Sequence, residues 1–364
     1  MNQGTVITFY SYKGGVGRTF VMANVAVVLA RWGYRVLCVD WDLEAPGLWH
    51  YFEPWLKDSS RGMLQFLETF VRTGNADWRN YSTPVDLPDM GNRLHVIHAG
   101  SRQDDYVKGV QDLHWARLYE ERDLGAFLER VRDEWKSAFD FILVDSRTGI
   151  TDIGGICTVQ LPDILICALV ANQQNLDGIV EISNRALKAR SRLPYDRGLL
   201  LILPLVCRFD ARDEYAAGQK WLGQLAESLA PLYHSWINDK VTPRDLIDRT
   251  TIPYFSIWSF GARLPVATES SANPEYVSYR IETIAALIGH SLARTDLLVE
   301  SRDSYVAAAR RAAQRGFRYD VFVSATEEAR DLVAQLVTAL NRRGITTFQV
   351  FAGNPVEAKR ALSE

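Results

Sequence analysis

The chain has 364 residues and lacks any apolar run long enough to span a membrane. No signal peptide precedes the first apolar segment, so we expect a cytoplasmic protein without a membrane partner. Cysteine is scarce, and its four positions are scattered along mostly apolar segments: Cys38, Cys157, Cys167 and Cys207. This scatter argues against disulfides or a cysteine metal site and predicts buried thiols, which suit a reducing compartment.

The chain also lacks a large excess of charge of one sign. It has 41 Lys and Arg residues and 44 Asp and Glu residues, which give a net charge of −3. That balance argues against a surface tuned throughout to nucleic acid or anionic membrane, but it leaves a local basic patch open. Histidines are few: His50, His98 and His114 are dispersed without metal-ligand spacing. No Ser-His-Asp signature supports a hydrolase triad.

What the sequence does have is 47% apolar residues, in short runs that alternate with amphipathic helical stretches. Near-continuous apolar strands separated by helices predict an α/β fold, with a mostly parallel sheet covered by helices on both faces. The expected strands are residues 5–11, 35–40, 93–98, 139–145, 163–169, 199–204 and 252–257. The main expected helices are residues 19–30, 62–70, 124–135, 176–190, 218–229 and 276–292.

The segment of residues 13–19 reads KGGVGRT and joins the first strand to the first helix. Its glycines let the backbone turn several N–H groups toward one anion, and the helix start adds its positive end. Lys13, Arg18 and the Thr19 hydroxyl are the groups that a nucleotide phosphate and its magnesium ion need. The segment therefore predicts a nucleotide-binding phosphate loop, and the alternative is a glycine-rich turn without a ligand.

Three acidic residues stand at the ends of two expected strands. Asp40 ends one strand and Asp42 follows it closely, whereas Asp145 ends another. The carboxyl ends of parallel strands face the crevice in which such sheets bind ligands, so we expect these carboxylates near the phosphate loop. The alternative for Asp40 and Asp42 is that they only cap the turn that follows.

The phosphate loop resembles the deviant loop of the MinD/ParA family of P-loop ATPases, K-G-G-x-G-K-[ST], with Arg18 in place of the second lysine. The resemblance runs from residue 4 to residue 292 and includes the D-x-D and P-G-L of residues 40–48. It implies ATP as the ligand and a homodimer that sandwiches two nucleotides, with Lys13 reaching the partner's phosphates. The residues it implies as nucleotide ligands are Gly14, Gly15, Val16, Gly17, Arg18, Thr19 and Phe20.

The same resemblance gives roles to the acidic residues. Thr19, Asp40 and Asp145 would hold Mg²⁺, the two aspartates through water. Asp42 would orient or activate the water that attacks the nucleotide. The chain is thus expected to be an ATPase, although Arg18 in place of the lysine leaves its turnover open.

Two further positions depart from the family pattern. Members of the family recognise adenine with an asparagine that follows one of the last strands of the sheet. At that position, residues 206–210 of this chain have no asparagine and instead offer Arg208 or Phe209 for stacking on a base. Arg147 lies in what would be the phosphate-sensing loop. It would sense the phosphate, touch a partner subunit, or pair with a surface carboxylate.

After residue 292 the pattern changes. Residues 301–318 form a helix-like segment with five arginines, which favours a solvated face over a nucleic-acid patch. Residues 317–325 and 340–348 resemble the opening of a TIR domain, and the alternative is a generic strand–helix–strand edge. The expected domains are 1–293 (nucleotide-binding), 294–316 (linker) and 317–364 (the start of a TIR-like domain).

Three functions are consistent with these features. The leading one is an ATP-dependent dimerisation switch that controls the TIR-like module, which could bind a protein partner, in bacterial signalling or defence against phage. The second is a scaffold that holds its nucleotide without hydrolysing it, because of Arg18. The third is a positioning ATPase that rides on DNA or another surface.

Overall fold

The structure is a computed structural model that describes residues 3–56, 61–100, 105–149, 155–195, 197–210, 212–314, 321–325, 329–342 and 347–351. Two compact units make up the chain. Residues 4–314 form the larger unit, and residues 315–364 with the first three residues form the other.

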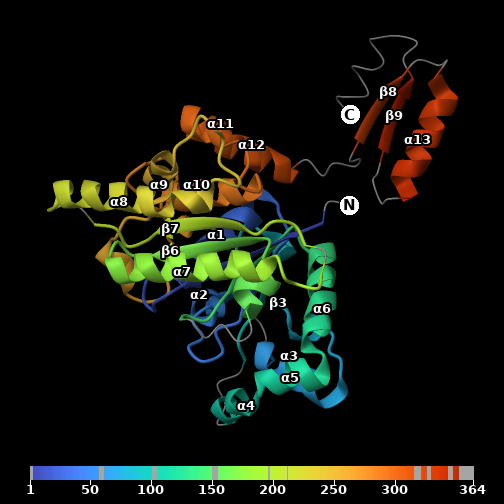
Figure 1. Cartoon of the computed structure of the whole chain (residues 1–364), viewed down its shortest axis with the longest axis horizontal. Helices are drawn as coiled ribbons and strands as arrows, with labels where there is room; N and C mark the ends of the chain where they lie inside the picture. Colours follow the sequence, from blue (N-terminus) through green and yellow to red (C-terminus); the bar gives the residue numbers. More distant parts are fainter. Residues whose placement is uncertain are drawn as a thin grey trace. The chain divides into compact units, whose positions relative to one another are not determined.

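A seven-stranded sheet, with the strand order β3-β4-β2-β5-β1-β6-β7, forms the centre of the larger unit (Figure 1). Its strands are β1 (Thr5–Ser11), β2 (Val36–Asp40), β3 (Thr83–Pro84), β4 (Leu94–Ile97), β5 (Phe141–Asp145), β6 (Ile164–Leu169) and β7 (Leu201–Val206). Every pairing is parallel except that of the short edge strand β3 with β4. The near-continuous apolar strands are buried, as expected for a parallel sheet with both faces covered.

Helices cover both faces of this sheet (Figure 1). The longer ones are α1 (Arg18–Trp32), α3 (Met63–Thr73), α6 (Leu124–Ala138), α7 (Gln173–Arg190), α8 (Tyr215–Tyr233), α10 (Val277–Gly289) and α12 (Arg302–Gln314). Shorter ones are α2 (Trp49–Phe52), α4 (Tyr106–Asp112), α5 (Trp115–Arg122), α9 (Pro243–Thr250) and α11 (Thr295–Glu300).

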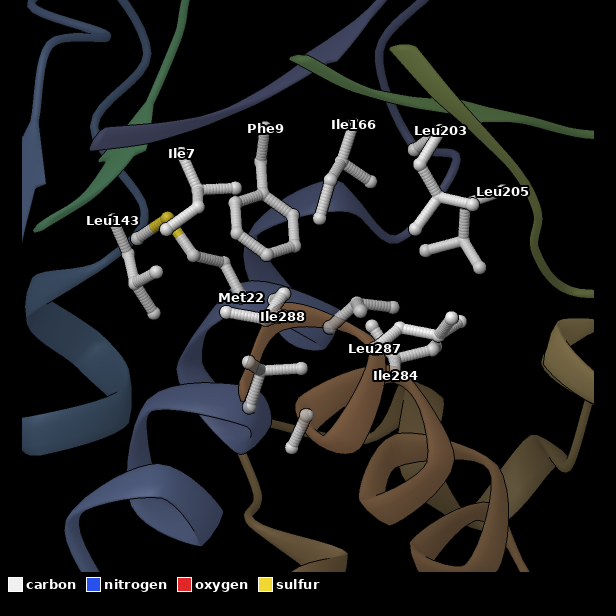
Figure 2. Close-up of a cluster of buried hydrophobic side chains, with 14 of the residues drawn as sticks. Ile7, Phe9, Met22, Leu143, Ile166, Leu203, Leu205, Ile284, Leu287 and Ile288 are labelled. Atoms are coloured by element: carbon white, nitrogen blue, oxygen red, sulfur yellow. The ribbon is translucent and has the colours of Figure 1, made fainter. Parts of the chain in front are cut away.

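Helices α1 and α10 pack side by side on one face of the sheet. Figure 2 shows Ile7 and Phe9 of β1 pointing toward Met22 of α1 and Ile288 of α10. All four side chains are fully buried. The α1 helix begins at the phosphate loop, so this packing fixes the loop's helical end against the core. On the opposite face, alternate residues of β1, β2 and β5 pack against α3 and α6 in a second apolar cluster.

The α/β sheet predicted from the sequence is confirmed, and so are six of its expected strands. The strand expected at residues 252–257 is wrong. Only Pro253 makes an isolated bridge there, to Phe209, and a 3₁₀ turn follows at Ser256–Ser259. Proline has no N–H to continue a ladder, so the segment runs beside the end of β7 without joining the sheet.

The segment expected as a linker contains α11 and α12, and α12 packs against α10 within the larger unit. In the other unit, β8 (Val321–Ala325) and β9 (Thr347–Phe351) form a parallel pair, and α13 (Arg330–Arg342) connects them in the chain. This confirms the predicted strand–helix–strand order. Val333 and Val337 form the buried stripe of α13. Residues 317–320 and 343–346, which carry part of the TIR resemblance, lie outside the described residues.

All four cysteines are buried, and none of them forms a disulfide, as predicted. Burial raises the pKa of the Cys167 and Cys207 thiols to about 12, so neither is poised for reaction. In the part of the chain that the structure describes, no helix is both long and apolar enough to cross a bilayer.

Candidate functional site

The phosphate loop occupies the turn between the end of β1 and the start of α1. Gly15 and Gly17 have positive φ angles of 76° and 96°, which a side chain would disfavour. A Cβ added at Gly14 or Gly15 would meet no atom within 4 Å, so the backbone faces open space there. No acidic residue lies in the first turn of α1, so the helix end keeps its affinity for anions.

Arg18, the first residue of α1, points away from solvent and toward two carboxylates. Its Nε donates to Asp145 Oδ1 at 2.5 Å, and its Nη2 donates to Asp42 Oδ2 at 2.9 Å. Burial lowers the pKa of Arg18, but the charges of Asp145 and Asp42 more than offset this, so the pKa is raised. Arg18 therefore remains a cation that joins the loop after β2 to the end of β5.

Asp40 and Asp145 lie side by side as register partners on β2 and β5. Thr19 Oγ1 donates to Asp145 Oδ2 at 2.7 Å, whereas the Asp40 carboxylate accepts the backbone N–H groups of Asp42 and Leu48. The structure thus brings together the three residues expected at a metal. Their oxygens are the donors that Mg²⁺ prefers.

The acidic cluster is electrostatically costly even with Arg18 beside it. Burial first, and then the charges of Asp145 and Asp42, raise the pKa of the Asp40 carboxyl well above its usual range. Burial also raises the pKa of Asp145, against the opposing effects of Arg18 and Thr19. Among the described residues, no group of three or more His, Cys, Asp and Glu side chains could hold a metal by itself. Mg²⁺ here would therefore take further oxygens from a nucleotide and from water.

A pocket of about 830 Å³ opens beside the phosphate loop. Residues 14–21 and Asp42 line it. Tyr254, Phe255 and Trp258 line it as well. Its volume falls within the roughly 300–1,000 Å³ of small-molecule sites, and aromatic faces suit the stacking of a planar base. These aromatic residues were not among the predicted site residues, although the apolar, aromatic run at 254–260 was a visible signal.

The two residues expected at the base differ in position. Arg208 lines the pocket, donates from Nη1 to the Gly15 carbonyl oxygen at 3.1 Å, and lies 4.9 Å from the Tyr254 ring centre. Phe209 does not line the pocket: it is half-buried, and its backbone pairs with Ile252 and Tyr254.

Lys13 and Arg147, which the sequence also singled out, do not line this pocket. Lys13 is exposed, does not line its own chain's pocket, and sits 5.5 Å from the Tyr12 ring centre. Arg147 pairs with Glu44 at 2.6 Å. Of the three alternatives for Arg147, this contact matches the pairing with a carboxylate. The pair connects the loop after β2 to the loop after β5.

Comparison with known proteins gives one family and several relatives. Residues 7–244 match the CobQ/CobB/MinD/ParA nucleotide binding domain. A probable plasmid-partitioning protein ParA of Thermus thermophilus is 25% identical over 258 residues, which cover 66% of this chain and 72% of that protein. An uncharacterized ATP-binding protein of Methanocaldococcus jannaschii is 27% identical over 145 residues, 40% of this chain and 45% of that protein.

Solved structures are similar in fold. The septum site-determining protein MinD of Pyrococcus horikoshii, complexed with Mg-ADP, has a TM-score of 0.52 and 19% identity, covering 78% of this chain and 96% of that one. The cell division ATPase MinD of Pyrococcus furiosus has a TM-score of 0.52 and 20% identity, covering 80% and 100%. The family match spans more than half of the chain and includes the phosphate loop and all three aspartates. The chain therefore belongs to the CobQ/CobB/MinD/ParA nucleotide-binding domain family.

Proposed function

We propose that this chain is an ATP-dependent dimerisation switch that hydrolyses ATP. The observation that carries the proposal is that one pocket of about 830 Å³ is lined by the phosphate loop, by Asp42 and by the aromatic residues Tyr254, Phe255 and Trp258. The phosphate loop would bind the triphosphate of a nucleotide, Asp42 would lie beside its γ-phosphate, and the aromatic side chains would stack on its base. A glycine-rich turn without a ligand would need none of them.

Different residues of the site would bind the phosphates, hold Mg²⁺ and orient the attacking water. The backbone N–H groups of the phosphate loop and the start of α1 would bind the phosphates. Thr19, Asp40 and Asp145 would hold Mg²⁺, which neutralises charge that develops on the phosphates when it is bound. Asp42 would orient the attacking water, because its carboxylate lines the pocket next to the loop.

Lys13 supports the dimeric part of the proposal. It is exposed and does not line the pocket of its own chain, so its charge is available to a second copy. Two copies facing each other through their phosphate loops would each place Lys13 on the partner's nucleotide. The MinD of Pyrococcus horikoshii, which is similar in fold, is complexed with Mg-ADP, and this supports a nucleotide as the ligand.

The output of the switch is proposed to be the C-terminal unit. Helix α1 starts at the phosphate loop and packs against α10, and α10 packs against α12, the last helix before that unit in the chain. A shift of α1 on nucleotide binding would therefore reach α12 through direct packing. With a TIR-like module at the end, the setting would be bacterial signalling or defence against phage.

Binding and assembly test this proposal separately. Calorimetry with ATP and Mg²⁺ should show one nucleotide per chain, and ADP should bind in the same pocket. Light scattering should show ATP-driven dimerisation of the parent chain and its loss in Lys13→Ala. Unchanged dimerisation of Lys13→Ala would remove the trans role of the lysine. Absence of nucleotide binding would remove the whole proposal.

A second candidate is a positioning or partitioning ATPase on DNA, which the similarity to a probable plasmid-partitioning protein favours. Within the described part of α12, Arg310 and Arg311 are exposed, whereas Arg302 is bound to Glu282. Salt-sensitive DNA binding that Arg310→Gln and Arg311→Gln weaken together would support this candidate. No binding at low salt would contradict it.

A further inference from the structure

The guanidinium of Arg18 has more donors than its protein partners use. Only 7% of the side chain is exposed, and it lines the pocket beside the phosphate loop. Nε donates to Asp145 and Nη2 donates to Asp42, but Nη1 is buried and has no hydrogen-bond partner among the described residues. A buried cationic donor without a partner is costly, so this nitrogen marks a place for an anion from the pocket.

The hydrogen bond from the same guanidinium also uses one of the two carboxylate oxygens of Asp42. One oxygen of that carboxylate accepts Arg18 Nη2, and the other accepts the backbone N–H of Ala45 at 3.2 Å. In hydrolysis, the water oxygen bonds to the γ-phosphorus while the bond from that phosphorus to the bridging oxygen of ADP breaks. The proton that the water loses passes first to a carboxylate oxygen. An oxygen that already accepts a charged hydrogen bond is a poor acceptor for that proton.

We propose that Arg18 is a positioning residue that clamps Asp42 and Asp145 with two nitrogens and gives the third, Nη1, to a phosphate oxygen of the nucleotide. This inference rests on the proposed ATP-binding function and adds its regulation. Nucleotide binding completes the clamp and leaves Asp42 held away from the attacking water. The ATP-bound state is therefore long-lived, and turnover requires Asp42 to leave Arg18.

Lysine at this position could not do the same. Arginine presents its donors in a planar fork that spans two carboxylates and a third acceptor, whereas lysine offers one compact ammonium. Arg18→Lys keeps the charge for the phosphate but cannot hold Asp42 and Asp145 in the same plane. The substitution should therefore release Asp42 and retain nucleotide binding.

The test is single-turnover hydrolysis of ATP with Mg²⁺ by the full chain, with the dissociation constant measured in parallel. Arg18→Lys should hydrolyse at least about tenfold faster than the parent chain, equivalent to about 1.4 kcal/mol, while its affinity stays within about threefold. Asp42→Asn should be slow, and the double variant Arg18→Lys, Asp42→Asn should be as slow as Asp42→Asn. A purely structural role of Arg18 would not produce a faster enzyme.

Three results would overturn the inference. Arg18→Lys could bind ATP and hydrolyse it no faster than the parent chain. The double variant could remain as fast as Arg18→Lys, so that the acceleration does not pass through Asp42. The parent chain could bind no ATP, which removes the proposed function and the clamp together, whereas the first two results leave the proposed function standing.

A second measurement applies if circular dichroism shows that Arg18→Lys does not fold. Asp42→Asn removes the competing carboxylate charge, so the full charge of Arg18 becomes available to the phosphate. Its affinity for ATP should rise at least about fivefold over the parent chain, whereas Asp42→Glu, which keeps the charge, should bind as the parent does. Equal affinity of Asp42→Asn and the parent chain would show that Arg18 does not contact the phosphate.

Discussion

The Tyr12 ring lies directly against the backbone of α7 at Gly178. A Cβ at position 178 would come within 2.2 Å of Tyr12 Cγ, a distance that no real contact reaches. Tyr12 immediately precedes Lys13 and the phosphate loop. The contact therefore fixes the start of the loop from the opposite side to α1, and it needs a residue without a side chain.

Gly178→Ala should displace Tyr12 and, with it, the phosphate loop. Overpacking of this kind costs about 1–3 kcal/mol, and we expect the affinity for ATP to fall as well. The control is Gly223→Ala in α8, where an added Cβ meets nothing closer than Arg244 Nη1 at 3.7 Å. That variant should be neutral or more stable by up to about 1 kcal/mol. Chemical denaturation and calorimetry check both, and equal effects of the two substitutions would contradict the role of the Tyr12 contact.

Removing the Thr19 hydroxyl should weaken nucleotide binding only when Mg²⁺ is present. Thr19→Ala leaves a buried oxygen of Asp145 without its donor, which should destabilise the protein by about 1–3 kcal/mol. Thr19→Ser keeps the hydroxyl and should bind ATP with Mg²⁺ as the parent chain does. Calorimetry with and without Mg²⁺ distinguishes the two. The same loss of affinity in both conditions would argue against Thr19 as a metal-holding residue.

The ion pair of Glu44 and Arg147 should contribute little to stability. Both side chains are partly exposed, at 53% and 33%, and such pairs contribute at most about 1 kcal/mol. A double-mutant cycle with Glu44→Gln and Arg147→Gln should therefore give a coupling free energy in that range. Arg147→Gln should change the affinity for ATP no more than about fivefold. A much larger loss, for ATP and not for ADP, would instead make Arg147 a sensor of the γ-phosphate.

Acid should loosen the packing of α10 against α12 through His290. Its Nε2 lies 3.0 Å from the carbonyl oxygen of Tyr305, and burial lowers the pKa of His290 below its usual value. The unfolded chain then binds the proton more readily than the folded one, so stability is lost as pH falls through the window below about 6.5. His290→Gln should flatten this dependence, whereas the same change at exposed His114 should not. Denaturation series between pH 7 and 5 provide the check.

Much of the fold and part of the site followed from local sequence patterns. Apolar runs predicted the parallel strands, and parallel strands bring their carboxyl ends to one edge, so Asp40 and Asp145 were expected to meet near the phosphate loop. The burial of the cysteines followed from the same apolar runs.

Other features depend on contacts between distant segments. The direction of the Arg18 side chain depends on two carboxylates that lie 24 and 127 residues away in the chain. Tyr254 and Trp258 line the pocket in a segment that was expected as a strand but forms a 3₁₀ turn at Ser256–Ser259. Phe209 was expected, as an alternative to Arg208, to stack on the base, but its backbone pairs with Ile252 and Tyr254 and it does not line the pocket.

The most direct test of the switch is the mass of the protein in solution by mass photometry, without nucleotide, with ADP, and with ATP and Mg²⁺. An ATP-dependent switch predicts a single-chain mass in the first two conditions and a dimer or larger species only with ATP and Mg²⁺. The same mass in all three conditions would contradict the switch.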